Sequence, residues 1–387
     1  MDTQKLDQTY IANTYARFPV TIVKGKGSLV WDDTGKEYID LSTGIAVDIF
    51  GVADEEWVAA VTKQLGTLQH ISNLYYTEPC VKLAQMLCEK TGMKKVFFGN
   101  SGAEANECAI KAARKWSEEK KGKDYSTIIT LKNSFHGRTI TTLAATGQDV
   151  FHHDFTPLTE GFVYAEPNDL ADLEQLIKAN KCAAVMMEVV QGEGGVMPMD
   201  EAYVKGAAKL CEQYDLLLIC DEVQVGNGRS GKLYGYMHYG VQPDIVSTAK
   251  GLAGGLPLGA TLLGEKVQDV LSAGTHGSTF GGNPVCCAGA INVLSRLDEK
   301  MLEGVEERSA YIKQELTGAK GVLGVSGLGL MLGIQTEKNA SDIIAACREK
   351  GVLVIKAKDK LRLLPALNIP MEQLQKAVAV IKACCAE

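Results

Sequence analysis

Short apolar runs, each about as long as one β-strand, alternate with amphipathic stretches between residues 94 and 265. Because every run but the last is followed by a polar loop that contains glycine, the pattern is typical of strands buried in an α/β sheet. It predicts an α/β fold, with a mostly parallel sheet flanked by helices. Ligands of such sheets bind beyond the carboxyl ends of the strands, so the residues after each run are the candidates for a site. The runs are KKVFFGN, STIITLKN, AAVMMEVV, LLLICDEV, PDIVSTAK and GATLLGE.

The chain length of 387 residues suits a large domain with a smaller one attached. We predict the large domain over residues 51–284 and a smaller α+β domain over 285–387. The smaller domain would hold a long helix (roughly 284–316), two strands around the charged turn KAKDK, and a final helix. Residues 1–50 would pack with the smaller domain, and their sequence GSLVWDDTGKEYIDL is typical of a hairpin that turns at Asp32–Gly35.

Charge and cysteine content exclude several classes of protein. The net charge is −7 and the basic residues are dispersed, so we expect no nucleic-acid partner and no membrane partner. The first residues, MDTQKLDQTY, carry no signal-peptide core. Eleven cysteines without a CxxC motif indicate a reduced, cytoplasmic protein. The six histidines have no metal-ligand spacing, so we expect no metal site.

Lys250 lies at the end of an apolar run and just before a glycine-rich loop. Its neighbours are small, which leaves the amine room to meet a ligand. A desolvated amine has a lowered pKa and can form an imine with a carbonyl group. The alternative is a lysine that reaches from the end of a strand to water.

Two further strand ends carry groups that suit an anionic, planar ligand. Ser101, Gly102, Ala103 and Glu104 open a helix, whose first N–H groups can bind an anion, although the same residues suit an ordinary N-cap. After the next run, Phe135 could stack on a planar ligand and Arg138 could bind a carboxylate. The alternative is that Phe135 is a core residue and Arg138 a solvated surface residue.

Carboxylates occupy the remaining strand ends. Glu188 and Glu193 flank the end of the run AAVMMEVV, where glycines follow. Asp221 and Glu222 end a run of five apolar residues, where a carboxylate is costly to bury without a partner.

Residues 226–231, GNGRSG, match the dinucleotide-binding motif GxGxxG and follow a strand, with Asp244 at about the right distance. The next segment, KLYGYMHYGVQP, lacks the helical apolar period that the motif requires. A nicotinamide-dependent oxidoreductase is kept only as an alternative class of enzyme for this chain.

An imine-forming lysine, a buried carboxylate, an aromatic stack and a phosphate site together describe one cofactor. Pyridoxal 5'-phosphate has an aldehyde, a ring nitrogen that must stay protonated, a flat face and a phosphate. The sequence therefore predicts a pyridoxal-phosphate enzyme.

The chain also resembles a known family, the class III (fold-type I) aminotransferases, and most closely their acetylornithine aminotransferase group. The motifs that carry the resemblance are NSGAEAN, SFHGR, VVQGEGGV, CDEVQVGNGRSG, STAKGL and HGSTFGGNP, in this order along nearly the whole chain.

The resemblance implies how the cofactor is held. Lys250 would bind its aldehyde and Asp221 its ring nitrogen. Phe135 and Val223 would lie on opposite faces of the ring. The phosphate would be bound by Ser101, Gly102 and Ala103.

It also implies a homodimer with shared sites and a set of substrate contacts. Gln224 would approach the ring hydroxyl, and Thr279 would reach the phosphate in the neighbouring subunit. Arg138 and Arg362 would bind substrate carboxylates, with Glu193 opposite Arg362.

The chain departs from the family between Asp48 and Trp57. After GIAV the family has N-x-x-G-H-x-H-P, whereas this chain has an acidic loop without the histidines or the proline.

The resemblance implies transfer of the side-chain amino group of an N-acylated ornithine to 2-oxoglutarate, in arginine synthesis. Other ω-aminotransferases, acting on ornithine, succinylornithine, 4-aminobutyrate or an acylated diaminopimelate, remain alternatives. Outside the aminotransferases, a pyridoxal enzyme such as an aminomutase and a non-catalytic binding protein remain.

Overall fold

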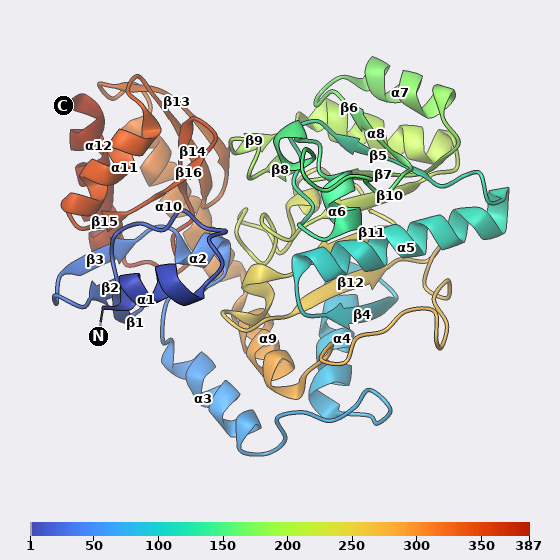
Figure 1. Cartoon of the computed structure of the whole chain (residues 1–387), viewed down its shortest axis with the longest axis horizontal. Coiled ribbons are helices and arrows are strands. Elements are labelled where there is room, and N and C mark those ends of the chain that lie inside the picture. The colour runs from blue at the N-terminus through green and yellow to red at the C-terminus, as the bar shows by residue number, and fades with distance from the viewer. Residues whose placement is uncertain (1) are drawn as a thin grey trace.

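A seven-stranded sheet forms the centre of the protein (Figure 1). The computed structural model describes residues 2–387. β12 runs antiparallel to both of its neighbours, and the other pairings in this sheet are parallel, as the alternating runs predicted. In spatial order the strands are β4 (Lys95–Gly99), β12 (Gly259–Leu263), β11 (Ile245–Thr248), β10 (Leu217–Asp221), β7 (Cys182–Met187), β5 (Thr127–Leu131) and β6 (Phe162–Ala165).

All six predicted runs are strands of this sheet, and β6 is an additional strand that we did not predict. β6 is a short edge strand whose residues are mostly half-buried. It therefore lacks the long apolar run by which the inner strands are recognised.

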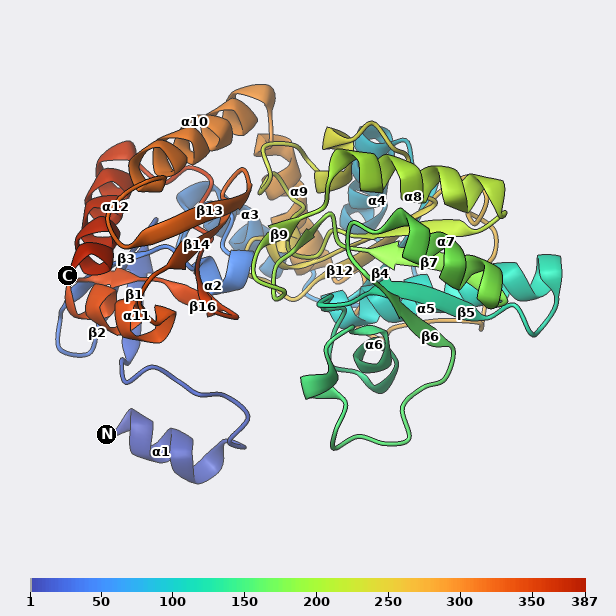
Figure 2. The ribbon, with the colours of Figure 1, turned by 90° about the horizontal axis from the view of Figure 1, so that it is seen from above.

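Helices cover both faces of the sheet (Figure 2). On one face, α5 (Gly102–Lys121) buries Ile110 and Trp116 against strand residues such as Ile219. On the other, α8 (Glu201–Gln213) buries Val204, and Leu218 belongs to that second core. Leu218 and Ile219 point to opposite faces because successive side chains alternate along a strand. The other helices around the sheet are α3 (Glu55–Leu65), α4 (Glu78–Thr91), α6 (Ile140–Ala145), α7 (Leu170–Ala179) and α9 (Pro284–Arg296).

The C-terminal part forms an α+β unit around the sheet β13-β14-β17-β16. Its strands are β13 (Val322–Leu328), β14 (Met331–Thr336), β16 (Ile355–Ala357) and β17 (Lys360–Leu363), and its helices are α10 (Glu299–Leu316), α11 (Ala340–Glu349) and α12 (Met371–Ala386). The turn within KAKDK is confirmed. The single helix expected over 284–316 is wrong: α9 ends at Arg296, and Asp298 begins α10 by accepting a hydrogen bond from the N–H of Met301 at 2.8 Å.

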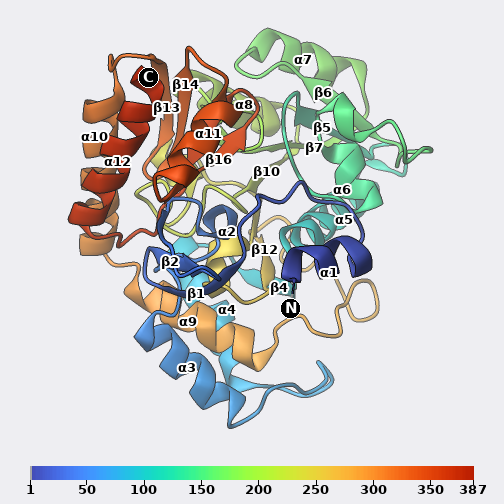
Figure 3. The same ribbon diagram turned by 60° about the vertical axis from the view of Figure 1, so that its left-hand side comes forward.

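The N-terminal strands share a sheet with the C-terminal part (Figure 3). β2 (Leu29–Asp32) and β3 (Glu37–Asp40) form the predicted hairpin, and the N–H of Gly35 donates to Asp32 O at 3.0 Å. β3 pairs in parallel with β15 (Val352–Leu353). Domain boundaries at residues 50 and 284 stay a prediction. The remaining elements are α1 (Thr3–Tyr10), β1 (Ile22–Lys26), α2 (Thr43–Ala46), β8 (Val190–Gln191), β9 (Met197–Pro198) and the 3₁₀ turns η1 (Asp149–Phe151), η2 (Gly235–His238) and η3 (Lys250–Ala253).

Candidate active site

Lys250 begins η3, directly beyond the carboxyl end of β11. Its backbone has φ +48°, a left-handed conformation that a lysine rarely adopts. Burial lowers the pKa of its amine to about 8, although the negative charge of Glu193 acts in the opposite direction. At physiological pH a larger fraction of this amine is therefore neutral than of an ordinary lysine, and the neutral amine is the form that can act as a nucleophile.

Asp221 is the last residue of β10, the strand next to β11, and is 4% exposed. Its Oδ2 accepts from Nδ2 of Asn106 at 2.8 Å and lies 2.8 Å from Nδ1 of His136, and its Oδ1 accepts from the N–H of Val223 at 3.0 Å. The carboxylate favours the histidine tautomer with the proton on Nδ1. These contacts fix one carboxylate at the same edge of the sheet as Lys250.

Sequence reasoning did not include Asn106 or His136 among the site residues. Both are almost completely buried. Asn106 follows Ala105 and precedes Cys108 and Ala109 on the apolar face of α5, and a polar side chain on such a face needs a buried partner. That mismatch is the signal that could have identified it.

Glu222, the neighbour of Asp221, is completely buried and belongs to a different contact. Its two oxygens accept from the N–H groups of Gly235 at 2.7 Å and Tyr236 at 2.8 Å. Burial raises the pKa of this carboxyl to about 8. Of the two adjacent acids, only Asp221 is part of the candidate site.

Ser101 is the N-cap of α5, and its hydroxyl accepts from the N–H of Glu104 at 3.1 Å. The first intrahelical bond from this cap runs from the N–H of Ala105 to Ser101 O, so the N–H groups of Gly102 and Ala103 precede it and lie at the positive end of α5. A Cβ atom at Gly102 would lie 2.6 Å from Cγ1 of Val223. Glycine therefore lets the anion-binding end of α5 approach the residues after Asp221.

Phe135 and Arg138 follow β5. The N–H of Phe135 donates to Oε1 of Glu188 at 2.8 Å, and its half-buried ring meets Phe151 edge to face at 5.9 Å. Burial, together with the charge of Asp221, raises the pKa of Glu188 well above its usual range. The exposed guanidinium of Arg138 lies over the ring of Phe151 at 4.1 Å from its centre, free to meet a ligand.

Arg362 extends from β17 of the C-terminal part and is 3% exposed. Its Nη1 donates to Oε1 of Glu193 at 2.5 Å and to Oε1 of Gln224 at 3.0 Å. Burial acts to raise the pKa of Glu193, but the charge and hydrogen bond of Arg362, together with the charge of Lys250 and the hydrogen bond of Gln224, outweigh burial, and the pKa is lowered. The charges of Glu193 and Arg362 both act on the pKa of Lys250, which Glu193 raises and Arg362 lowers.

The structure does not bring Thr279 to the site residues described above. Thr279 is exposed and lines a surface pocket with His70, Asn73 and Ser278. Its predicted contact with a neighbouring subunit stays a prediction.

The dinucleotide-binding interpretation of residues 226–231 is wrong. No α-helix follows the loop directly in the described chain; turns lead instead to η2. Arg229 within the loop is completely buried, and its Nη1 donates to the carbonyl oxygens of Leu330 and Pro365. The C-terminal part thus occupies the space that a pyrophosphate would need.

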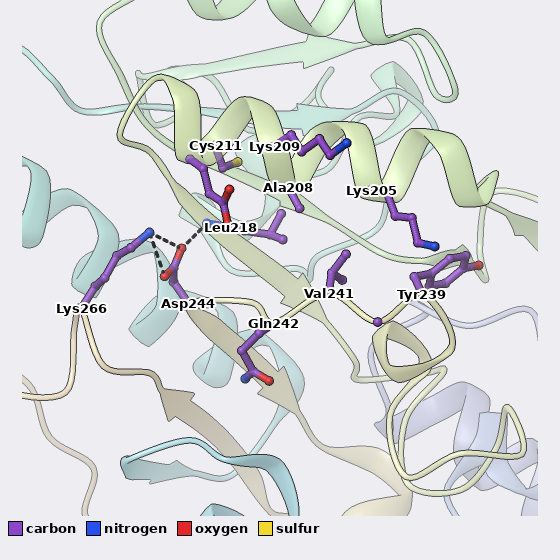
Figure 4. A pocket seen from close by; sticks show the side chains of 12 residues that line it. Lys205, Ala208, Lys209, Cys211, Leu218, Tyr239, Val241, Gln242, Asp244 and Lys266 are labelled. Atoms are coloured by element: carbon purple, nitrogen blue, oxygen red, sulfur yellow. Dashed lines mark hydrogen bonds and ion pairs between the residues drawn. The ribbon is translucent and has the colours of Figure 1, made fainter.

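A separate pocket of about 570 Å³ lies at the opposite edge of the sheet (Figure 4). It is lined by Leu218 near the start of β10 and by Asp244 just before β11, where Lys266 pairs with Asp244 at 3.2 Å. None of the predicted site residues lines it, and ligands of parallel sheets bind at the other edge. Residues 2–387 contain neither a cluster of potential metal ligands nor a helix long and apolar enough to cross a membrane.

Known proteins are similar to this chain in fold and in sequence. The family model described as aminotransferase class-III matches residues 10–385. The chain belongs to the class-III aminotransferases. The acetylornithine aminotransferase of Haemophilus ducreyi is 49% identical over 386 residues, covering 99% of this chain and 98% of that protein. The enzyme of the same name from Caldanaerobacter subterraneus is 44% identical, covering 97% of each.

Two solved structures extend the comparison for this class-III aminotransferase. The ornithine aminotransferase of Toxoplasma gondii superposes with a TM-score of 0.95 at 33% identity, covering 99% of this chain and 94% of that one. The N-acetylornithine aminotransferase of Stenotrophomonas maltophilia superposes with a TM-score of 0.86 at 36% identity, covering 99% and 98%. A further structure of the Toxoplasma enzyme has partial occupancy of PLP at its active site.

Class-III aminotransferases depend on pyridoxal phosphate, and the residues of this chain fit that cofactor. Lys250 offers an amine of lowered pKa for the aldehyde, and Asp221 a fixed carboxylate for the ring nitrogen. The first N–H groups of α5 suit the phosphate.

Proposed function

We propose that this aminotransferase transfers the side-chain amino group of N2-acetylornithine to 2-oxoglutarate, giving N-acetylglutamate 5-semialdehyde and glutamate in arginine biosynthesis. The names of its 42–49% identical relatives support this substrate. The observation that carries the proposal is the ion pair between buried Arg362 and half-buried Glu193, whose charges act on Lys250, because this pair suits a site that must receive two unlike substrates.

The proposed chemistry assigns one task to each residue. Pyridoxal phosphate, when bound, supplies an aldehyde for the amino group and a ring that withdraws electrons. Lys250 would bind the aldehyde of the cofactor, and its amine would move the proton at the reacting carbon of the substrate. Asp221, fixed by Asn106 and His136, keeps a proton at the ring nitrogen.

The remaining residues bind and orient the cofactor and the substrates. Phe135 and Val223 would lie on opposite faces of the cofactor ring, and Gln224 would approach its hydroxyl. Ser101, Gly102 and Ala103 would bind the phosphate, together with Thr279 of a second subunit. Arg138, exposed and supported by Phe151, binds the carboxylate farther from the reacting carbon in both substrates.

The ion pair explains how one site can accept both substrates. Acetylornithine presents an amine with no carboxylate beside it, so Glu193 stays on Arg362 and neutralises its charge. Glutamate has a carboxylate next to the reacting amine, and this group replaces Glu193 as the partner of Arg362. Arg362 thus binds a substrate carboxylate in only one of the two half-reactions.

Single-turnover rates of each half-reaction, followed by cofactor absorbance, test this assignment. We expect Arg362→Ala to slow the glutamate half-reaction much more than the acetylornithine half-reaction, and Glu193→Ala to shift the preference toward glutamate. Arg138→Ala is the matched comparison and should impair both. Equal losses in both half-reactions for Arg362→Ala and Glu193→Ala would show that the pair is structural.

Ornithine is the second candidate donor, because the Toxoplasma ornithine aminotransferase superposes so closely. Steady-state kcat/KM values for acetylornithine, ornithine, succinylornithine, 4-aminobutyrate and succinyldiaminopimelate separate these donors. A higher value for ornithine than for acetylornithine would replace the proposed substrate.

We also infer that the protein is a cytoplasmic homodimer. In each subunit, residues 51–284 form the larger domain, and residues 1–50 and 285–387 form the smaller one. Apolar side chains support the dimer: Leu74 is 88% exposed and Tyr76 fully exposed, near an apolar groove of about 550 Å³ that includes Phe280. Light scattering gives the mass in solution. A monomer that retains full activity would refute the shared site.

A further inference from the structure

The turn that carries Lys250 is held at both ends by side-chain N–H groups. Nδ2 of Asn227 donates to the carbonyl oxygen of Ala249, immediately before Lys250, at 3.0 Å. Nε1 of Trp57 donates to the carbonyl oxygen of Ala253, the last residue of η3, also at 3.0 Å. The two donors come from segments far apart in the sequence.

Trp57 fills space that glycines leave open. A Cβ atom at Gly254 would lie 2.8 Å from Nε1 of Trp57, and one at Gly289 would lie 3.0 Å from the same atom. Gly254 has φ +63°, so it also ends η3 in a conformation that glycine adopts without strain. The indole is thus in contact with the turn itself, and its N–H bond adds direction to that packing.

Trp57 is itself fixed to α9 through the acidic loop. Asp54 caps α3 by accepting from the N–H of Trp57 at 3.0 Å, and the same carboxylate binds Arg296 of α9 through two bonds of 2.5 and 3.0 Å. Figure 1 shows α3 beside α9. The loop in which this chain departs from its family therefore ends in a rigid support for η3.

Asn227 supports the other end of the turn, at Ala249. It is 1% exposed, has φ +57°, and its Nδ2 also donates to Oγ1 of Thr248 at 3.1 Å. Because asparagine tolerates the left-handed region better than most residues, this position suits both the backbone and the contact.

We propose that Trp57 and Asn227 are positioning residues that hold the strained Lys250 turn in register with the cofactor. The inference rests on the proposed role of Lys250 and adds two residues that act through it. Neither touches the reacting atoms. Their function is to keep half-buried Lys250 in its place rather than let its amine relax toward solvent.

Trp57→Phe in the holoenzyme tests the first contact, since it keeps an aromatic ring and removes the N–H. Release of the turn improves solvation of the lysine nitrogen, which favours its protonated form. The pH midpoint of the visible absorbance of the lysine–cofactor linkage should therefore rise by about 0.3 to 1 pH unit, since a typical hydrogen bond changes an equilibrium by about 2- to 10-fold. We expect kcat to fall by about the same factor, with the KM for the amino donor within about twofold of wild type.

Trp116→Phe is the matched control. Trp116 is 3% exposed, and among residues 2–387 its Nε1 has no hydrogen-bond partner. This variant makes the same chemical change without losing a hydrogen bond, so its absorbance midpoint should equal that of wild type. If both variants leave the midpoint unchanged, or shift it equally, Trp57 only fills space and the proposal fails.

Asn227→Gly tests the second contact, because glycine keeps the left-handed backbone and removes the amide. Its midpoint and kcat should change in the same direction as those of Trp57→Phe. Asn168→Gly, also at positive φ (+63°) but bonded to the N–H of Asp200 outside the site, should match wild type. An unchanged midpoint for Asn227→Gly would remove Asn227 from the proposal. Borohydride labelling of a lysine other than Lys250 would instead refute the function on which it rests.

Discussion

Glu222 provides a direct test of how burial changes a charge in this protein. It is completely buried, and its carboxyl pKa is raised from 4.5 to about 8. Below pH 4.5 the group is protonated in both the folded and the unfolded chain, and its contribution to stability is fully present. Between pH 4.5 and 8 only the folded chain keeps the proton, so this contribution is lost as the pH rises. Each pH unit costs about 1.4 kcal/mol, which amounts to about 5 kcal/mol over the window.

Glu222→Gln removes this dependence, because the amide does not titrate. The variant loses one acceptor for the N–H groups of Gly235 and Tyr236, which costs about 1–3 kcal/mol at every pH. Urea unfolding at one protein concentration, at pH 5 and pH 8, measures both effects. The free energy of unfolding of the variant relative to wild type should rise by about 4 kcal/mol between these pH values.

Glu303→Gln, at an exposed position, is the control and should keep the pH dependence of wild type. If Glu222→Gln also follows wild type between pH 5 and 8, then Glu222 is already ionised in the folded protein. The argument from its burial would be refuted.

Two further predictions concern the site. In the cofactor-free protein, acetylation of Lys250, followed by peptide mass spectrometry, should reach half its maximum rate near pH 8, because burial lowers the amine pKa to that value; a midpoint above pH 10 would contradict this. His136→Phe removes one of three donors to Asp221, and a hydrogen bond to a charged group contributes about 1.5–3 kcal/mol. Equilibrium dialysis should therefore show cofactor affinity about 10- to 100-fold weaker, and an affinity within about twofold of wild type would exclude the role.

The strand-end rule identified most of the candidate site from sequence alone. Ser101, Phe135, Asp221 and Lys250 each follow or end an apolar run, and parallel strands bring their carboxyl ends to one edge. The physical signal is local in each case, because it needs only the run and the residue after it. The large sheet was predictable for the same reason.

Contacts between distant segments carried no such signal. Arg362 and Glu193 were paired only through the resemblance to the family, since nothing in LRLLPAL says which carboxylate it meets. Residues 226–231 matched a motif, but the burial of Arg229 depends on carbonyl groups of the C-terminal part. The break between α9 and α10 was missed because the apolar period continues across Leu297, and the cap at Asp298 was overlooked.

The pairing of β3 with β15 has a consequence for how the protein is made. Ile39 lies opposite Val352, so β3 leaves the ribosome about 310 residues before its partner. At a synthesis rate of ~5–20 residues per second, that edge stays open for about 15 to 60 s. An unpaired strand edge can pair with other chains, and a chaperone that shields nascent chains would protect this one. Fragments that stop before residue 352 keep the edge open permanently, so expression of the N-terminal segment with the large domain alone should favour aggregation.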